Sequence, residues 1–197
     1  MHTQVLSADV EEDVRRAGEL LRAGELVAFP TETVYGLGAR ADDAEAVEAL
    51  YRVKQRPQDK KCAILIADPE DAERHVDGMG AEERRLAEAF WPGPLTLVVG
   101  QEDGMGVRCP DCDATRRMLR AAGVPVFAPS ANLSGHPPAR NAGEVLETFE
   151  GLIAAVLDGG PVSGGTPSTV VRVRHDEVEI LRPGALEAER VREVVGR

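Results

Sequence analysis

A polar segment at residues 30–38, Pro-Thr-Glu-Thr-Val-Tyr-Gly-Leu-Gly, offers two hydroxyls, a carboxylate and a phenol within five residues. It follows the apolar run 26–29, which is typical of a buried strand, and Pro30 ends that strand because proline lacks a backbone donor. Gly36 and Gly38 permit positive φ or close approach of a ligand to the backbone. The segment therefore fits a small-molecule site at a strand end, and it fits an ordinary strand-to-helix connection equally well. We call residues 30–38 the site loop.

Polar side chains follow three further expected strand ends, at Arg108, at residues 130–132 and at Ser168. If these ends meet at one edge of a sheet, they line a pocket rich in hydroxyls and cations, with no obvious general base. Such a pocket suits a nucleoside triphosphate and a small polar acid. Neither the P-loop pattern nor a G-x-G-x-x-G turn is present, so a phosphate site here must be built from side-chain cations.

The charge of the chain is unevenly distributed. Residues 52–61 hold five cations and one acid, a net charge of +4. Because the whole chain has a net charge of −11, the other 187 residues together carry −15. An acidic chain is a poor surface for coating nucleic acid, because non-specific affinity for phosphate backbones comes from Lys and Arg. A compact basic patch in such a chain favours a small polyanion as ligand.

Three cysteines are too few for a disulfide framework and agree with a reducing compartment. Cys109 and Cys112 have the C-x-x-C spacing of a redox pair or half a zinc site, but no second pair completes a zinc site, so we predict two ordinary thiols and no metal ligands. Apolar runs stay well below the ~20 residues of a membrane span. Residues 1–4 lack the features of a signal peptide, which predicts a cytoplasmic protein without a membrane partner.

Alternating helix and strand patterns predict the elements that position these groups. Asp9 with Glu12, Asp42 or Asp43, and Asn141 with Glu144 mark helix starts. Helices are expected over 9–24, 42–57, from 68, over 81–90 and 113–123, from 141 and after 184; strands are expected over 26–29, 62–67, 95–99, up to Arg108, and over 124–128, 153–157, 169–173 and 178–181, the last two antiparallel across residues 175–177. This order predicts an α+β (mixed α/β) domain, with helices packed on a mixed sheet.

Five segments in this order resemble the threonylcarbamoyl-AMP synthase family, also called YrdC-like: residues 30–38, Lys54-Gln55-Arg56-Pro57, Trp91-Pro92-Gly93-Pro94-Leu95-Thr96, Ser130-Ala131-Asn132-Leu133-Ser134-Gly135 and Leu181-Arg182-Pro183-Gly184. The resemblance runs from about residue 25 to 184. It implies a single three-layer domain over residues 1–197, whose twisted mixed sheet curves around a concave cationic cavity. The chain resembles the short, single-domain members of the family, which lack the second C-terminal domain of longer relatives.

The resemblance also implies a reaction: L-threonine, bicarbonate and ATP give threonylcarbamoyl-AMP and pyrophosphate, for threonylcarbamoyladenosine formation in tRNA. By resemblance, Lys54 and Arg56 are catalytic. ATP would be held by Arg56, Lys60, Asn132, Arg140 and Arg182, with Lys54 also at its phosphates, and threonine by Thr33, Arg108, Ser130 and Ser168. Mg²⁺ is expected with the phosphates, without a visible set of protein ligands. The product would pass to the tRNA threonylcarbamoyl transferase machinery.

Alternatives stay open from the residues alone. Lys54 and Arg56 also fit a solvated helix end, favoured by the helix dipole, and Ser130 fits a turn cap. A non-catalytic RNA-binding module of the same fold is the main alternative function, against which the acidic remainder counts. The carbamoyl-transfer domain of hydrogenase maturation proteins is a second, but it normally sits in a much longer chain. The sequence departs from some relatives at Leu65, where they carry a histidine near the threonine site.

Overall fold

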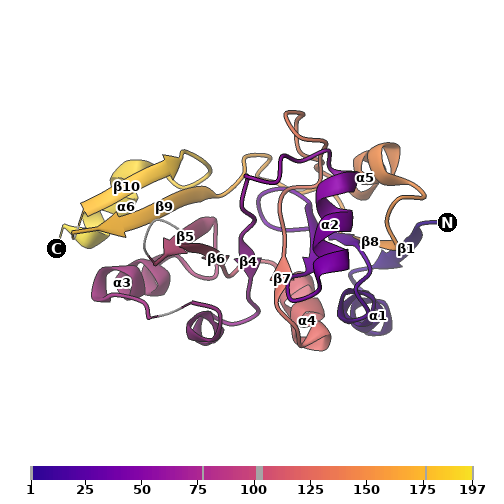
Figure 1. Ribbon diagram of the computed structural model, residues 1–197, viewed down its shortest axis with the longest axis horizontal. Coiled ribbons are helices and arrows are strands. Elements are labelled where there is room, and N and C mark those ends of the chain that lie inside the picture. The colour runs from indigo at the N-terminus through magenta and orange to yellow at the C-terminus, as the bar shows by residue number, and fades with distance from the viewer. Residues whose placement is uncertain (1, 77, 101–103, 176, 197) are drawn as a thin grey trace.

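The structure is a computed structural model that describes residues 2–76, 78–100, 104–175 and 177–196. Within these ranges ten strands form one mixed sheet, in the order β1-β8-β2-β3-β7-β4-β6-β5-β9-β10. The strands are β1 (Gln4–Ser7), β2 (Val27–Phe29), β3 (Gly36–Arg40), β4 (Ile64–Leu65), β5 (Leu95–Val99), β6 (Met105–Arg108), β7 (Val126–Phe127), β8 (Ala155–Asp158), β9 (Thr169–Arg174) and β10 (Glu177–Arg182). The helices are α1 (Glu11–Arg22), α2 (Ala44–Val53), the 3-10 helix η1 (Pro69–Arg74), α3 (Ala81–Phe90), α4 (Asp113–Ala122), α5 (Ala142–Phe149) and α6 (Ala188–Val195). The two termini lie at opposite ends of the molecule (Figure 1).

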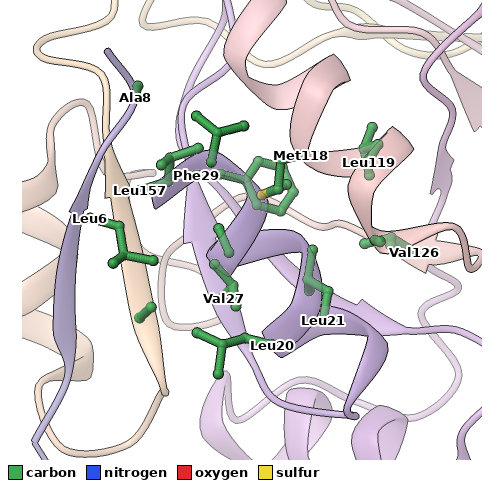
Figure 2. Close-up of a cluster of buried hydrophobic side chains, with 14 of the residues drawn as sticks. Leu6, Ala8, Leu20, Leu21, Val27, Phe29, Met118, Leu119, Val126 and Leu157 are labelled. Atoms are coloured by element: carbon green, nitrogen blue, oxygen red, sulfur yellow. The ribbon is translucent and has the colours of Figure 1, made fainter. Parts of the chain in front are cut away.

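The half of the sheet made by β1, β8, β2, β3 and β7 has helices on both faces (Figure 1). Successive residues of β2 point to opposite faces, as in any strand. Val27 and Phe29 pack with α1 and α4 on one face, and Ala28 packs with α2 and α5 on the other. Figure 2 shows the first of these clusters, with Phe29 among side chains of both helices. This half is the three-layer part of the predicted fold.

The half made by β6, β5, β9 and β10 has helices on one face. Leu95 and Leu97 of β5 and Val171 of β9 pack against α3 and α6. The alternate residues Thr96 and Val170 point the other way and line a cavity. The predicted class, a mixed sheet flanked by helices around a cationic cavity, is confirmed.

Several predicted boundaries agree closely with the structure. The helix over 81–90 and the strand over 95–99 have the expected bounds, because Trp91-Pro92-Gly93-Pro94 separates them. Asp43 caps α2 by accepting from the backbone N–H of Glu45 and Ala46, and Asn141 caps α5 by accepting from Glu144. The terminal hairpin pairs β9 with β10 as expected, although Asp176 of its turn lies outside the described residues.

Other boundaries were wrong. The carboxylate of Asp9 does not cap the first helix, which begins at Glu11, and Asp13 instead accepts from the backbone N–H of Ser7. Asp68 precedes a short 3-10 helix without capping it, because its carboxylate accepts hydrogen bonds from Arg116 and Arg120 of α4. Strands β4 and β7 are two residues long, shorter than expected. None of the helices in the described ranges is long and apolar enough to cross a membrane.

Candidate functional site

A cavity of about 330 Å³ lies on the helix-free face of β5, β6 and β9. Its described lining contains five cations and several hydroxyls but no carboxylate. The lining residues are Thr31, Val34, Tyr35, Gly36, Arg56, Lys61, Cys62, Ala63, Leu65, Thr96, Val98, Gly104, Gly106, Arg108, Ala128, Pro129, Ser130, Pro167, Ser168, Val170, Arg172, Leu181 and Arg182. Such a lining selects for an anionic ligand.

Arg108 is the best-fixed cation of the cavity. It is 7% exposed, its Nε donates to the carbonyl of Gly93 at 3.1 Å, and its Nη2 donates to Glu32 Oε1 at 2.6 Å and to Thr33 Oγ1 at 3.1 Å. The second oxygen of Glu32, Oε2, is buried without a hydrogen-bond partner. Because three groups hold the guanidinium before any ligand arrives, little side-chain entropy remains to be lost on binding.

The site loop is held by its own hydroxyls. Thr31 Oγ1 donates to the carbonyl of Val34 at 2.6 Å and lies 2.9 Å from Thr33 Oγ1. The hydroxyl of Tyr35 donates to the carbonyl of Gly160 at 2.8 Å and accepts from the N–H of Gly159, so the loop after β8 is tied to the site loop. Burial raises the pKa of Tyr35 to about 12, so the phenol stays protonated and a donor.

Gly36 and Gly38 serve packing as well as the site. A Cβ at Gly38 would lie 2.6 Å from the ring of Phe29, and one at Gly36 would lie 3.1 Å from it. Neither glycine has a positive φ. Of the two uses that the sequence allowed, positive φ is not found, and Gly36 lines the cavity. The glycines of β3 make room for an aromatic ring on the neighbouring strand.

Ser168 and Arg182 form a second polar group at the cavity. Ser168 Oγ lies 2.8 Å from Thr96 Oγ1 and accepts from Arg182 Nη2 at 3.1 Å, and the carbonyl of Ser168 accepts from the same nitrogen at 2.7 Å. Desolvation, and then repulsion by Arg108 and Arg56, lower the pKa of Arg182 although its side chain is exposed. The three arginines thus act as one positive cluster.

Arg56 reaches the cavity from the turn after α2. Its Nε donates to the carbonyl of Lys60 at 3.1 Å and its Nη2 to that of Lys61 at 2.9 Å. These bonds shape the basic segment into a loop that curls around the guanidinium. Gln55, between Lys54 and Arg56, has φ of 50°, an uncommon value for a residue with a side chain.

Lys54 is placed differently from Arg56. It is 1% exposed, and its ammonium donates to the carbonyls of Ser130 at 2.5 Å and Asn132 at 2.6 Å. Burial, followed by repulsion from Arg56, lowers the pKa of Lys54 to about 8, against a smaller opposing effect of Cys62. Lys54 is not among the cavity-lining residues and lies behind the loop that carries Ser130.

The structure brings five of the predicted site residues into the lining itself: Arg56, Arg108, Ser130, Ser168 and Arg182. Thr33 lies directly behind Arg108. Asn132 shapes its own loop, accepting from Ser130 Oγ at 2.5 Å and donating to the carbonyls of Leu133 and His136. Lys60 and Arg140 are exposed and lie outside the lining.

Sequence reasoning did not single out Thr96, Arg172 or the pairing of Glu32 with Arg108. The signal for Arg172 was the alternation in β9, where Val171 and Val173 pack against the helices, so that the residues between them face the cavity. Nothing in the sequence indicated that Glu32, 76 positions before Arg108, would contact it.

Two sequence features lie at or near this site. Leu65 lines the cavity and makes that part of its wall apolar. Cys109 and Cys112 are both free thiols, and burial raises the pKa of Cys109 to about 11, so this thiol is unreactive. In the described part of the chain no cluster of three or more His, Cys, Asp or Glu side chains is placed to hold a metal ion.

Comparison with known proteins agrees with this geometry. The family model described as "Telomere recombination", which unites Sua5, YciO and YrdC proteins, matches residues 19–184. Proteins named threonylcarbamoyl-AMP synthase from Bacillus subtilis (strain 168) and Pyrococcus abyssi are 38% and 40% identical, each over 93% of this chain, which spans only 56% and 57% of their lengths. The crystal structure of P. abyssi Sua5 complexed with L-threonine is similar with a TM-score of 0.92 at 37% identity, over 100% of this chain and 61% of that one. The predicted resemblance is confirmed: the chain belongs to the Sua5/YciO/YrdC family.

Proposed function

We propose that this chain is an L-threonylcarbamoyladenylate synthase, a nucleotidyltransferase that makes threonylcarbamoyl-AMP and pyrophosphate from L-threonine, bicarbonate and ATP. The observation that carries the proposal is the cluster of Arg56, Arg108 and Arg182 beside the hydroxyls of Ser130 and Ser168, in a cavity whose described lining holds no carboxylate. The relatives named for this activity support it.

Arg108 binds the carboxylate of threonine in this proposal. Its Nε donates to Gly93 and its Nη2 to both Glu32 and Thr33, so Nη1 is the nitrogen left for the ligand. The N–H groups of a charged guanidinium nitrogen make strong hydrogen bonds to a carboxylate oxygen. Thr33 accepts from Nη2 and so helps to fix the guanidinium, while Ser130 and Ser168 offer hydroxyls to the amino acid.

The chemistry needs alignment and charge stabilisation, without a covalent nucleophile from the protein. The threonine amine adds to bicarbonate and water leaves, giving a carbamate. A carbamate oxygen then attacks the α-phosphorus of ATP, and the bond to pyrophosphate breaks. Because two anions must meet, Arg56 and Arg182 contribute by neutralising the phosphates as charge moves onto the leaving group.

Lys54, Lys60, Asn132 and Arg140 remain proposed ATP residues. Lys54 holds the backbone of the loop that carries Ser130, and direct contact with phosphate requires its ammonium to leave the two carbonyls. Lys60 and Arg140, being exposed, would contact ATP at the mouth of the cavity.

We infer that Mg²⁺ enters as MgATP. The described lining supplies cations and neutral oxygens, a donor set that fits phosphate oxygens better than a bare divalent cation, so the phosphates themselves would hold the metal. When bound it would supply further neutralisation of the leaving group. We place the reaction in the cytoplasm and propose that the product passes to the machinery that modifies tRNA.

The test is product analysis of the purified protein with ATP, threonine and bicarbonate. Pyrophosphate release should require both threonine and bicarbonate, because the attacking oxygen exists only in the carbamate. Serine should react about 10-fold or more slowly, since loss of one methyl from a fitted pocket costs roughly 1–3 kcal/mol. Release that is equally fast without any amino acid would mean a plain ATPase, and RNA binding without turnover would favour the non-catalytic alternative.

A further inference from the structure

Arg172 is a cation of the cavity that the proposed reaction has not used. It lines the cavity from β9, and its side chain is 16% exposed. Its Nε is buried and donates to no acceptor within the described residues. Its nearest carboxylate, Oε2 of Glu179, is 3.9 Å from Nη1, too far for a hydrogen bond.

The register of the sheet places Arg172 on the cavity floor. Arg172 lies opposite Val98 of β5, and Val98 lies opposite Gly106 of β6. Gly106 has no side chain, Val98 is short, and Ala63, whose Cβ would lie 3.1 Å from a Cβ at Gly106, is also small, so no long side chain stands here beside the guanidinium. On its other side Arg172 pairs with Glu179 of β10. The open space therefore extends from Arg172 across β5 and β6, into the cavity.

Residues that lie opposite one another on neighbouring strands form a row across the sheet. Arg172 is in the row next to the one that contains Arg182. Val170 pairs with Thr96 on one side and with Arg182 on the other. Arg172 is two positions further along the same strand, about 7 Å away by the rise of a β-strand. A ligand with two or more linked phosphates therefore can contact both arginines at once.

A buried donor without a partner is destabilising, and that cost is recovered when a ligand supplies the acceptor. We propose that Arg172 binds the terminal phosphates of the nucleotide, and hence the pyrophosphate that leaves. This inference rests on the proposed function, because the ligand is taken to be ATP.

Arg172 is set apart from Arg108 and Ser168, two of the proposed threonine residues. Arg108 is two residues along β6 from Gly106, so it lies opposite Thr96, whose hydroxyl contacts Ser168. Arg172 lies in the next row. In an in-line displacement the leaving group departs on the side opposite the attacking oxygen. A cation displaced from the amino-acid groups is therefore placed for the leaving pyrophosphate.

The matched variants are Arg172→Met and Arg174→Met. Arg174 is on the same strand and the same face, two residues on, but it is exposed and outside the lining. Calorimetric titration with inorganic pyrophosphate, ATP and AMP measures binding without turnover. Arg172→Met should weaken pyrophosphate and ATP binding by about 10-fold or more and leave AMP binding nearly unchanged, whereas Arg174→Met should change none of the three.

Two further variants keep the inference open to refutation. Arg172→Lys keeps the charge but loses the Nε donor and should give an intermediate loss. Glu179→Gln removes the nearest carboxylate and should leave pyrophosphate binding equal or tighter. Wild-type pyrophosphate affinity in Arg172→Met, no pyrophosphate binding by the wild-type protein, or an equal loss for AMP would each overturn the role of Arg172. Wild-type protein that binds pyrophosphate through Arg172 but forms no threonylcarbamoyl-AMP would overturn only the proposed function.

Discussion

Side chains alternate between the two faces in both halves of the sheet, but helices pack on both faces of one half and on only one face of the other. In β2 both faces are packed, with Phe29 against α1 and α4 and Ala28 against α2 and α5. In β5 only one face is packed, and Thr96 on the other faces the cavity. The difference shows how one sheet can be both scaffold and site: where a helix layer is missing, alternate side chains carry polar groups instead of packing.

Phe29→Ala should have the largest effect on stability, because its ring is fully buried in the packed half. We expect the free energy of unfolding to fall by about 3–5 kcal/mol, measured by urea denaturation. Leu181→Ala is the matched change on the cavity side, where the side chain is 40% exposed, and should cost less than about 1 kcal/mol. Similar losses for both variants would contradict the distinction between the two halves.

Arg56→Ala should reduce kcat/KM by about 100- to 1,000-fold, or roughly 3–4 kcal/mol, since it removes one preorganised cation from the cavity. Stability should change little, because the lost bonds are to two carbonyls of an exposed loop. Arg52→Ala, at an exposed position of the preceding helix α2, is the control. Pyrophosphate release at the wild-type rate by the Arg56 variant would remove Arg56 from the catalytic machinery.

Lys54→Met tests a buried residue that holds the loop carrying Ser130 and is also a proposed ATP residue. The variant leaves the carbonyls of Ser130 and Asn132 without their donor, so we expect a loss of about 1–3 kcal/mol at pH 7 by denaturation. Lys60→Met, at an exposed position, should leave the free energy of unfolding unchanged. A Lys54→Met protein as stable as wild type would show that the loop carrying Ser130 is held by other contacts.

The difference in stability between the wild type and Lys54→Met should depend on pH, and the pKa of Lys54 gives the sign of that dependence. Lys54 has a pKa of about 8 in the folded protein, against 10.5 for an ordinary lysine. Between these values the unfolded chain binds the extra proton, so the stability of the wild type rises with pH relative to Lys54→Met, by at most about 1.4 kcal/mol per pH unit. A difference between the two proteins that stays flat from pH 8 to 10 would mean that the ammonium is not desolvated.

The sequence predicted much of the fold because local signals mark many of its elements. The Trp-Pro-Gly-Pro segment gave the end of α3 and the start of β5, and strand ends led to Arg108 and Ser168. The burial of Lys54 was not predictable, because a basic residue at a helix end is usually solvated and the covering loop is 76 positions away. Arg172 escaped notice because alternation alone does not tell which face of a strand lacks helices.

Because β8 lies between β1 and β2 in the sheet, these strands can pair fully only after β8 has been synthesised. Gln4 pairs with Ala155, so the first strand has no neighbour in the sheet until about 150 further residues have been made. At roughly 5–20 residues per second, that interval is about 8–30 s. β5 and β6, by contrast, pair within a short stretch of chain. The packed half is therefore closed late, by a strand that is made after β5 and β6 but before β9, so the cavity floor is completed only after the strand that closes the packed half has been made.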